Sequence, residues 1–281
     1  MIDPAWVALS LTERVGGKTL RALMAHFNHD PRAILAADET ALRQVPGIGA
    51  KMAERIRSIN VSEVEQAIPR WQGAGVRIIL RDDRDYPPQL RALDDYPPTL
   101  FVRGLWQPMG NKRVAVVGTR DPSPEAREIA SRLGIELAER GCTIVSGLAL
   151  GIDAAAHNGA LTVPNAYLLA VLGCGVLNIY PPDHRGLAQA VMRQGALLGE
   201  VHPQASPSAS NLVARNRIIT GLSDVVIIVE TEIDGGAMHA ARFALAQGRP
   251  LYTFDSPASG NRALLANGAV ALHPDLRDSP F

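Results

Sequence analysis

The chain has 281 residues and carries 28 lysines and arginines against 28 aspartates and glutamates, so its formal net charge is zero. This length exceeds a typical single domain and predicts one large and one small domain. Zero net charge excludes a global basic field, so any nucleic-acid site must be a local patch. Only Lys18, Lys51 and Lys112 are lysines. Arginine therefore supplies most of the cations, which favours bidentate phosphate contacts and stacking on bases.

Neither a secretory signal nor a membrane span is expected. The N-terminus carries Asp3 and lacks a basic segment ahead of an apolar core. The longest charge-free apolar stretch, residues 166–180, is shorter than a membrane span and is interrupted by glycines. We therefore expect a cytoplasmic protein. Cys142 and Cys174 have no partner at metal-ligand spacing and are expected to be reduced core residues, so the sequence predicts no metal and no cofactor.

Residues 1–68 predict a small all-helical domain of the helix-hairpin-helix or sterile-alpha-like kind. Apolar residues recur at helical spacing, and a Gly-Ile-Gly turn at residues 47–49 precedes the last of these apolar-faced helices. Hairpin amides of this kind can hold a DNA phosphate, with Lys51 nearby. The same domain can equally serve only for packing or for protein contacts, and the sequence leaves both interpretations open.

Residues 69–110 are interpreted as a connecting segment that adds strands to the main sheet. Short strands are expected at residues 76–80 and 99–102, separated by two Tyr-Pro-Pro segments. The acidic cluster of Asp82, Asp83 and Asp85 between them is interpreted as a solvated turn.

Residues 111–281 begin with a strand–helix–strand unit. The first strand, Val114–Val117, ends at Gly118-Thr119-Arg120, and the second, Cys142–Val145, ends at Ser146-Gly147. Strands and helices then alternate as far as Phe254, which predicts an α/β fold with an extended Rossmann-like, doubly wound, mostly parallel sheet. The strand ends of such a sheet open onto a crevice that suits phosphate. The glycine spacing of a dinucleotide site and the lysine of a P-loop are both missing.

One connection departs from this alternation. Residues 202–214, rich in Ser, Pro and Ala, are predicted to form a long loop that leads to Arg215-Asn216-Arg217 at a helix N-terminus. Long loops inside compact domains tend to carry function. A parallel sheet would bring Arg120, Arg215 and Arg217 to one crevice edge, where they would form a phosphate track.

Acidic groups also lie near the predicted crevice. Asp153 and His157 are four residues apart on one helix and could form an acid/base pair. No nucleophile or metal ligand accompanies them, so we favour a structural pairing of His157 with Asp153 and assign no catalytic residue. Glu230 and Glu232 follow a strand at the crevice rim, where they either shape the pocket or repel phosphate.

Five segments between about residue 76 and residue 272 read, in order, GTR, SGLALGIDAAAH, GCGVLNIYPP, ARNRIITGLSDVVIIVE and GRPLYTFD. Together they resemble the DNA-processing protein A family, also called Smf. The resemblance implies a non-enzymatic protein that binds and protects single-stranded DNA and helps to load the recombinase RecA in natural transformation and recombination. Three features depart from the family pattern: Leu150 replaces Arg, Leu212 replaces Phe, and residues 234–237 replace a Ser-Gly-Ser type of turn.

The strand ends and the resemblance together predict a DNA-contacting set. Its members are Gly118, Thr119, Arg120, Ser146, Gly147, Arg215, Asn216 and Arg217, with Lys51 in the helical domain. The resemblance also implies a homodimer formed near the C-terminal end. Leu264 and Leu265 are adjacent in a predicted short helix and cannot both face one apolar stripe, so they are the expected interface. Single-strand-binding protein is a further expected partner.

The alternative function is a nucleotide-processing enzyme similar to the lysine-decarboxylase-like phosphoribohydrolases. Those enzymes carry a Pro-Gly-Gly-x-Gly-Thr loop followed by a catalytic Glu. The corresponding stretch here, residues 234–239, reads DGGAMH and lacks the third Gly, the Thr and the Glu. The sequence therefore favours the binding protein over the enzyme.

Overall fold

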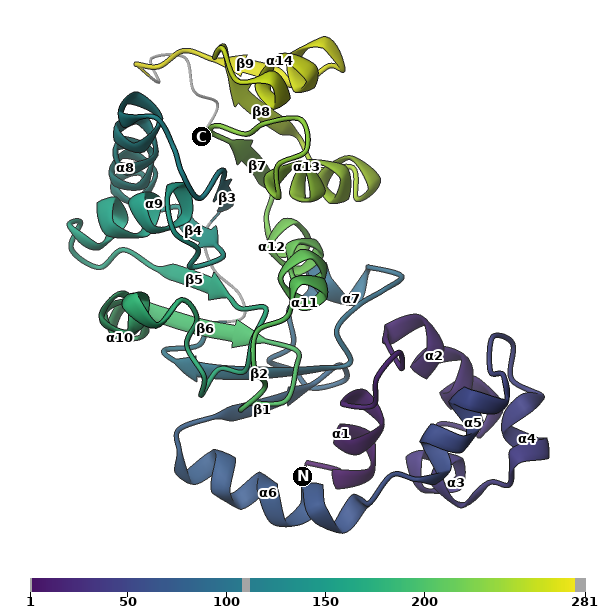
Figure 1. Cartoon of the computed structure of the whole chain (residues 1–281). Coiled ribbons are helices and arrows are strands. Elements are labelled where there is room, and N and C mark those ends of the chain that lie inside the picture. Colours follow the sequence, from purple (N-terminus) through teal and green to yellow (C-terminus); the bar gives the residue numbers. More distant parts are fainter. Residues whose placement is uncertain (1, 108–111, 276–281) are drawn as a thin grey trace. The chain divides into compact units, whose positions relative to one another are not determined.

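A computed structural model describes residues 2–107 and 112–275 of the chain (Figure 1). The chain divides into two compact units. The first comprises the chain up to Phe101 together with Glu200–His202, and the second comprises Val102–Gly199 and the chain from Pro203 onwards. The three-part division at residues 68 and 110 stays a prediction.

The first unit contains seven helices and strand β1 among its described residues. They are α1 (Pro4–Ser10), α2 (Gly17–His26), α3 (Pro31–Ala36), α4 (Glu39–Arg43), α5 (Ala50–Arg57), α6 (Val61–Gly73), β1 (Arg77–Leu80) and α7 (Pro88–Arg91). Side chains of Asp3, Asp30 and Asp38 cap the helices that follow them by accepting amide hydrogen bonds. Buried apolar residues from α1 to α5 form one core. These helices confirm the predicted all-helical domain.

The turn before α5 has the expected hairpin geometry. Gly47 has a φ of 87°, a region that favours glycine, and Gly49 precedes the first residue of α5. Lys51 is exposed in the first turn of α5.

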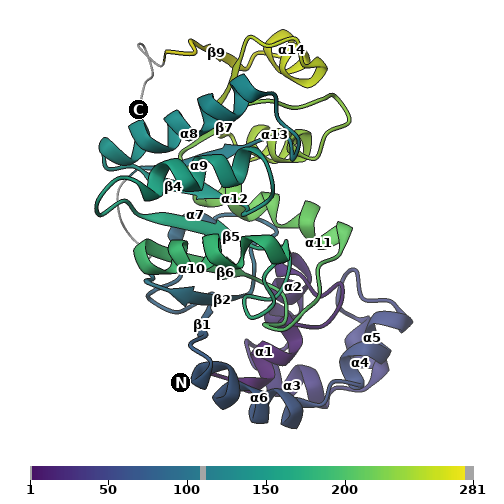
Figure 2. The same cartoon turned by 60° about the vertical axis from the view of Figure 1, so that its left-hand side comes forward.

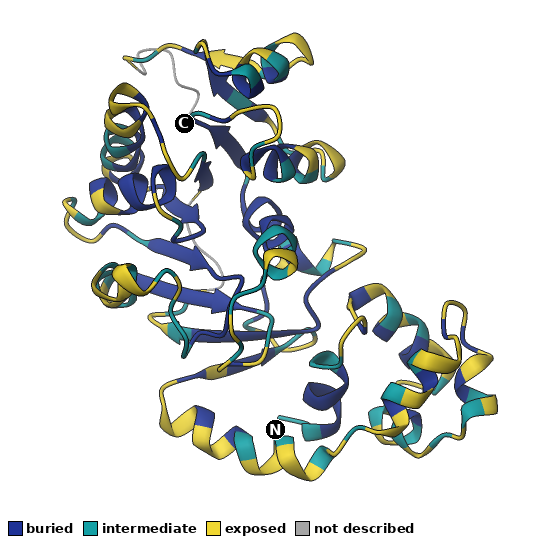
Figure 3. Cartoon of the chain, in the orientation of Figure 1, coloured by how far each residue is buried: buried dark blue, intermediate teal, exposed yellow. Residues whose placement is uncertain are grey.

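The second unit is built on a parallel sheet. Its strands are β3 (Arg113–Val117), β4 (Thr143–Ser146), β5 (Leu168–Val171), β6 (Gly195–Gly199), β7 (Val225–Ile228), β8 (Leu251–Phe254) and β9 (Val270–Leu272). Their order is β6-β5-β4-β3-β7-β8-β9, every neighbouring pair is parallel, and β2 (Thr99–Gly104) lies next to β6. Strands β3 to β7 are buried along their whole length (Figure 3). Burial on both faces explains their continuous apolar sequences.

Helices cover both faces of this sheet, as a doubly wound fold requires. Figures 1 and 2 show α8 (Pro124–Glu139), α9 (Ile152–Leu161) and α10 (Arg185–Gln194) on one face. The other face carries α12 (Asn216–Leu222) and α13 (Ala237–Ala246). A short helix, α14 (Ser259–Ala266), precedes β9. The predicted Rossmann-like α/β class is confirmed.

The expectation of a structureless loop over residues 202–214 is wrong in its second half. Residues Ala209–Ala214 form a helix, α11, because the Ser208 side chain caps it by accepting a hydrogen bond from the amide of Asn211 (3.2 Å). Helix α11 leads directly into α12, so Arg215 lies at a junction between two helices.

The strand order places a topological switch in the centre of the sheet. From β3 the chain builds β4, β5 and β6 outward in one direction, and it then returns to place β7 against the opposite side of β3. At such a switch point the two connections leave the sheet in opposite directions and open a crevice at the carboxyl ends of the strands.

Helices α8 and α9 pack unusually close together because glycines face the contact. A Cβ atom added to Gly134 would meet the carbonyl oxygen of Ala156, whereas a Cβ atom added to Gly186 in α10 would meet nothing. We expect Gly134→Ala to lower the free energy of unfolding by about 1–3 kcal/mol through overpacking. The matched control, Gly186→Ala, should raise it by up to about 1 kcal/mol through helix propensity. Denaturant unfolding measures both, and equal stability of the two variants would contradict the close packing.

Candidate nucleic-acid interface

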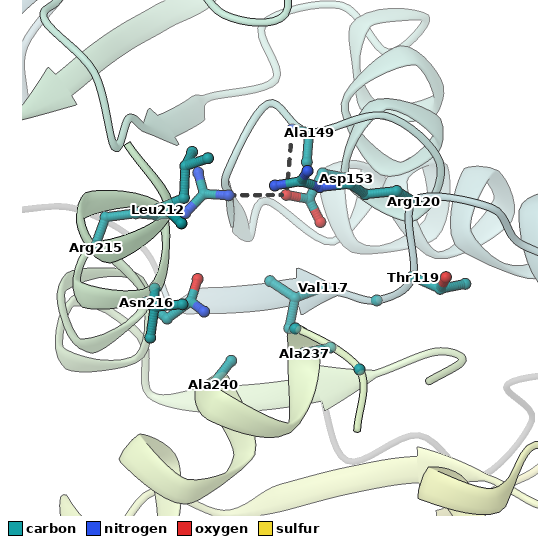
Figure 4. Close-up of a pocket in the computed structure, with 15 residues that line it drawn as sticks. Val117, Thr119, Arg120, Ala149, Asp153, Leu212, Arg215, Asn216, Ala237 and Ala240 are labelled. Atoms are coloured by element: carbon teal, nitrogen blue, oxygen red, sulfur yellow. Dashed lines mark hydrogen bonds and ion pairs between the residues drawn. The ribbon is translucent and has the colours of Figure 1, made fainter. Parts of the chain in front are cut away.

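A pocket of about 450 Å³ opens at the switch point between β3 and β7 (Figure 4). Four segments line it: the end of β3 with the residues after it (Val117–Arg120), the loop after β4 with the start of α9, the α11–α12 junction, and Gly235–Ala237 with Ala240 of α13. A smaller pocket of about 30 Å³ shares four of these lining residues. The two pockets together form the crevice.

The structure brings most of the predicted DNA-contacting residues to this crevice. Gly118, Thr119, Arg120, Arg215 and Asn216 line the larger pocket, and Gly147 lines the smaller one.

The other members of the predicted set lie elsewhere. Ser146 is fully buried, and its hydroxyl donates a hydrogen bond to the carbonyl of Val116 (2.6 Å). Arg217 is only 9% exposed, and its carbonyl accepts a hydrogen bond from the side chain of Gln247 (3.0 Å). Lys51 belongs to the first unit.

A buried ion pair forms the floor of the crevice. The Arg215 guanidinium, in a residue 6% exposed, lies 3.8 Å from the carboxylate of Asp153 and donates hydrogen bonds to the carbonyls of Gly147 and Val171. Burial lowers the pKa of Arg215, and Asp153 acts in the opposite direction. Burial likewise raises the pKa of the Asp153 carboxyl, and Arg215 together with two backbone amides opposes that shift. Each charge therefore depends on the other to remain buried.

The loop between β4 and α9 is shaped around this pair. Asp153 accepts hydrogen bonds from the amides of Gly147 (3.1 Å) and Ala149 (3.3 Å). A Cβ atom at Gly147 would collide with the Arg215 guanidinium, so only glycine fits at this position. Leu148 has a φ of 58°, which is strained for a branched side chain. Strain of this kind persists where the surrounding contacts fix the backbone.

Arg120 is the exposed cation of the crevice. It forms no ion pair with any other residue that the structure describes. In Figure 4 its side chain extends across the pocket toward Asp153, and its charge helps to lower the pKa of Arg215. Two arginines of like charge therefore share this site, which lowers the cost of bringing an anion into it.

Both rim carboxylates support neighbouring loops through hydrogen bonds. Glu230 accepts hydrogen bonds from the amide and the hydroxyl of Ser123 (2.8 Å each), and Glu232 accepts them from the amide (3.1 Å) and hydroxyl of Ser259. The hydrogen bonds from Ser259 lower the pKa of Glu232. Both carboxylates therefore shape the loops of the rim.

Helix α13 begins at the wall of the pocket. Gly236 precedes the helix without a side-chain cap, and Ala237 is its first residue. Uncapped amides at a helix N-terminus attract anions through hydrogen bonding and through the helix dipole. At the start of α9, Asp153 already occupies the corresponding position. The geometry therefore suits an anion between α13 and Arg120.

The expected pairing of His157 with Asp153 is wrong. His157 is fully buried, and both of its ring nitrogens lack a hydrogen-bond partner in the described part of the chain. Asp153 pairs with Arg215 instead, because the first turn of α9 faces the crevice whereas His157 lies a turn further into the core. Burial, together with the charges of His184 and Arg215, lowers the pKa of His157 to about 3. His157 is therefore a neutral core residue.

Several residues that line the crevice could not be assigned to it from the sequence. Ala149, Val213 and Ala240 lie at the crevice only because of the loop and helix geometry. For the fourth segment, the sequence signal is the Gly235-Gly236 pair, which follows β7 and precedes α13. Residues 2–107 and 112–275 contain no group of three or more His, Cys, Asp or Glu able to hold a metal ion. Within the same ranges, every helix is too short or too polar to cross a membrane.

The fold and the crevice define an α/β protein with a pocket at a topological switch point and a helix-hairpin-helix domain. The chain belongs to the DNA recombination-mediator protein A family, whose model matches residues 77–276. A model of a SAM-like helix-hairpin-helix tandem matches residues 9–58. These matches confirm the resemblance seen in the sequence, and neither family description names a catalytic activity.

Two curated relatives, both named protein Smf, are similar to most of this chain. Protein Smf of Escherichia coli K12 is 38% identical over 239 residues, which cover 83% of this chain and 63% of that protein. The chain therefore spans less than two thirds of this relative. Protein Smf of Synechocystis is 35% identical over 277 residues, covering 95% of this chain and 69% of that protein.

Solved structures show the same fold. DNA processing protein A from Streptococcus pneumoniae matches with a TM-score of 0.80 and 26% identity, covering 96% of this chain and 95% of that one. A structure that addresses the single-stranded DNA binding mode of DNA processing protein A from Helicobacter pylori matches with a TM-score of 0.62 and 30% identity. It covers 69% of this chain and 89% of that one.

The burial of His157 predicts a pH dependence of stability. Between a pH of about 3 and 6.5, His157 binds a proton in the unfolded chain but not in the folded one. The free energy of unfolding should therefore fall as the pH drops below 6.5, by up to about 1.4 kcal/mol per pH unit from this residue. Urea unfolding of the parent and of His157→Leu measures the difference in slope. The control His26→Leu, which removes an exposed histidine, should keep the parent slope; an unchanged slope in His157→Leu would contradict this account.

Proposed function

We propose that the chain binds single-stranded DNA in the crevice between β3 and β7 and acts as a non-enzymatic recombination mediator. In this role it protects incoming strands and helps to load RecA during natural transformation. The observation that carries the proposal is that Arg120, exposed and without an ion pair among the described residues, lines one pocket together with the start of α13, above a floor fixed by Arg215 and Asp153. Membership of the family and the likeness to the Helicobacter pylori protein support it.

Within the predicted DNA-contacting set we assign two different roles. Arg120 and the amides of Gly236 and Ala237 contact phosphate, because they reach the pocket without a competing partner among the described residues. Arg215, Gly147 and Ser146 position the loops, since their polar groups are engaged in buried contacts. The preference for single strands follows from the small size of the site and from the accessibility of unpaired bases.

The alternative of a nucleotide-processing enzyme is less well supported. Hydrolysis would need a carboxylate free to act on a substrate. Asp153, Glu230 and Glu232 all accept hydrogen bonds from backbone amides, and Asp153 also pairs with Arg215. Their positions in the crevice suit support of its walls rather than general acid–base catalysis.

The remaining partners follow from the same role. We propose a cytoplasmic homodimer that meets RecA and single-strand-binding protein on DNA. The hairpin at residues 47–51, with Lys51 exposed beside it, offers amides for a second phosphate contact. Two crevices in one dimer would raise the avidity for a long strand.

The exposed position of Arg120 predicts a specific binding defect. Arg120→Ala should remove about one phosphate contact and lower the salt slope of single-strand binding by roughly 0.7. The loss should be similar across base compositions, and thermal unfolding should match the parent because Arg120 is exposed. The control is Arg140→Ala, which removes an exposed arginine paired with Glu136 (3.8 Å) after the last turn of α8. If Arg120→Ala binds with the parent affinity and slope, the crevice is not the DNA site.

The dimer can be tested at α14. Leu264 is 5% exposed and belongs to the core, whereas the neighbouring Leu265 is half-buried and available for contact. Leu265→Glu should lower the mass measured by light scattering to that of a monomer without unfolding the protein. Leu264→Glu should lower the melting temperature, because it places a charge in the core. Leu245→Glu, an exposed position of α13, serves as control. A parent mass equal to one chain would exclude the dimer, and a dimeric mass unchanged in Leu265→Glu would place the interface elsewhere.

A further inference from the structure

Tyr180 is an aromatic side chain held at the surface. Large apolar side chains are exposed at six positions of the described chain, and Tyr180, 36% exposed, is the single aromatic among them. Leu150, 44% exposed, lies in the same small pocket. A scattered exposed apolar residue needs no explanation, but an apolar group gathered beside a polar site marks a binding surface.

This apolar surface is continuous with the anion site. The small pocket lined by Tyr180, Leu150 and Pro181 shares Arg120, Ala149, Leu212 and Arg215 with the larger one. Arg120 therefore lines one pocket with the start of α13 and the other with Tyr180. An occupant of the whole crevice must carry an anionic group and, joined to it by a short linker, a flat group that can lie against an apolar surface. A nucleotide of a single strand meets both requirements.

The segment that carries Tyr180 is fixed on both sides of the ring. Before it, the amides of Gly175 and Leu177 donate hydrogen bonds to the carbonyls of Ala205 (2.9 Å) and Pro203 (2.8 Å). After it, the ring Nδ1 of His184 lies 2.8 Å from the carbonyl oxygen of Leu148, within the loop that Asp153 organises. Because the backbone on both sides of Tyr180 is fixed, little chain ordering is needed when a base stacks on its ring.

We propose that Tyr180 is a base-stacking residue, and that the base stacked on its ring belongs to a nucleotide whose phosphate contacts Arg120. This inference rests on the proposed single-strand binding. Leu150 and Leu212 flank the stacked base with apolar surface. Stacking on one aromatic face tolerates every base, so the contact adds affinity without sequence preference, and a duplex cannot make it because its base faces are covered.

The test compares two probes on the full chain: a homothymidine oligonucleotide and an abasic strand of the same length, which keeps the phosphates and lacks the bases. Tyr180→Ala should weaken binding to the homothymidine strand by about 5- to 150-fold, with an unchanged salt slope and unchanged affinity for the abasic strand. Tyr180→Phe, which keeps the ring and removes the hydroxyl, should bind both like the parent. Arg120→Ala should weaken both, and Leu245→Ala, an exposed apolar control on α13, should weaken neither.

Thermal unfolding of each variant confirms that it is folded, and Tyr180→Phe and Tyr180→Trp decide the matter if Tyr180→Ala does not fold. In that case, weaker binding of the homothymidine strand by Tyr180→Phe or by Tyr180→Trp overturns the stacking role. If Tyr180→Ala binds homothymidine like the parent while Arg120→Ala does not, the stacking inference fails and the proposed function stands. If the parent binds neither probe, both fail.

Discussion

The ion pair between Asp153 and Arg215 holds together the segments that form the crevice. Asp153 fixes the loop after β4 through two amides, and Arg215 ties the α11–α12 junction to the carbonyls of Gly147 and Val171. Removal of one partner would leave a buried charge uncompensated, at a cost of about 3–5 kcal/mol. The Asp153 carboxylate balances the charge of the Arg215 guanidinium beneath the pocket, which leaves Arg120 as the exposed cation above it. The fold and the electrostatics of the site therefore depend on one interaction.

The charged side chains around this floor have two different roles. Some hold the loops of the crevice in place, and one is exposed and can contact a ligand. The carboxylates of Glu230 and Glu232 hold loops in place through serines, whereas Arg120 points into the pocket from an exposed position. A chain with zero net charge can bind a polyanion in this way, because a local arrangement of cations and helix amides replaces a global basic field. The topological switch supplies the place where these groups converge.

Much of the fold could be predicted because its signals are local. The strands expected at residues 114–117 and 142–145 lie within one residue of these bounds, because each is a largely apolar run that ends next to a glycine. Helix α11 was missed because its Ser- and Ala-rich sequence resembles a loop, and β9 because a short, largely exposed strand is specified by pairing with β8. The Asp153–Arg215 contact depends on tertiary packing, so the sequence offered His157 as the nearer partner. Residue type alone could not separate exposed Arg120 from buried Arg217.

Hydrogen–deuterium exchange with and without a homothymidine strand tests most directly where DNA binds. The account predicts that the strand protects the amides of residues 118–123 and 235–238, at the two strand ends that flank the switch point. It also predicts little change along the opposite edge of the sheet, where α8 ends at Glu139. Protection confined to the hairpin at residues 47–51, with exchange at the switch point unaltered by saturating DNA, would contradict the central claim.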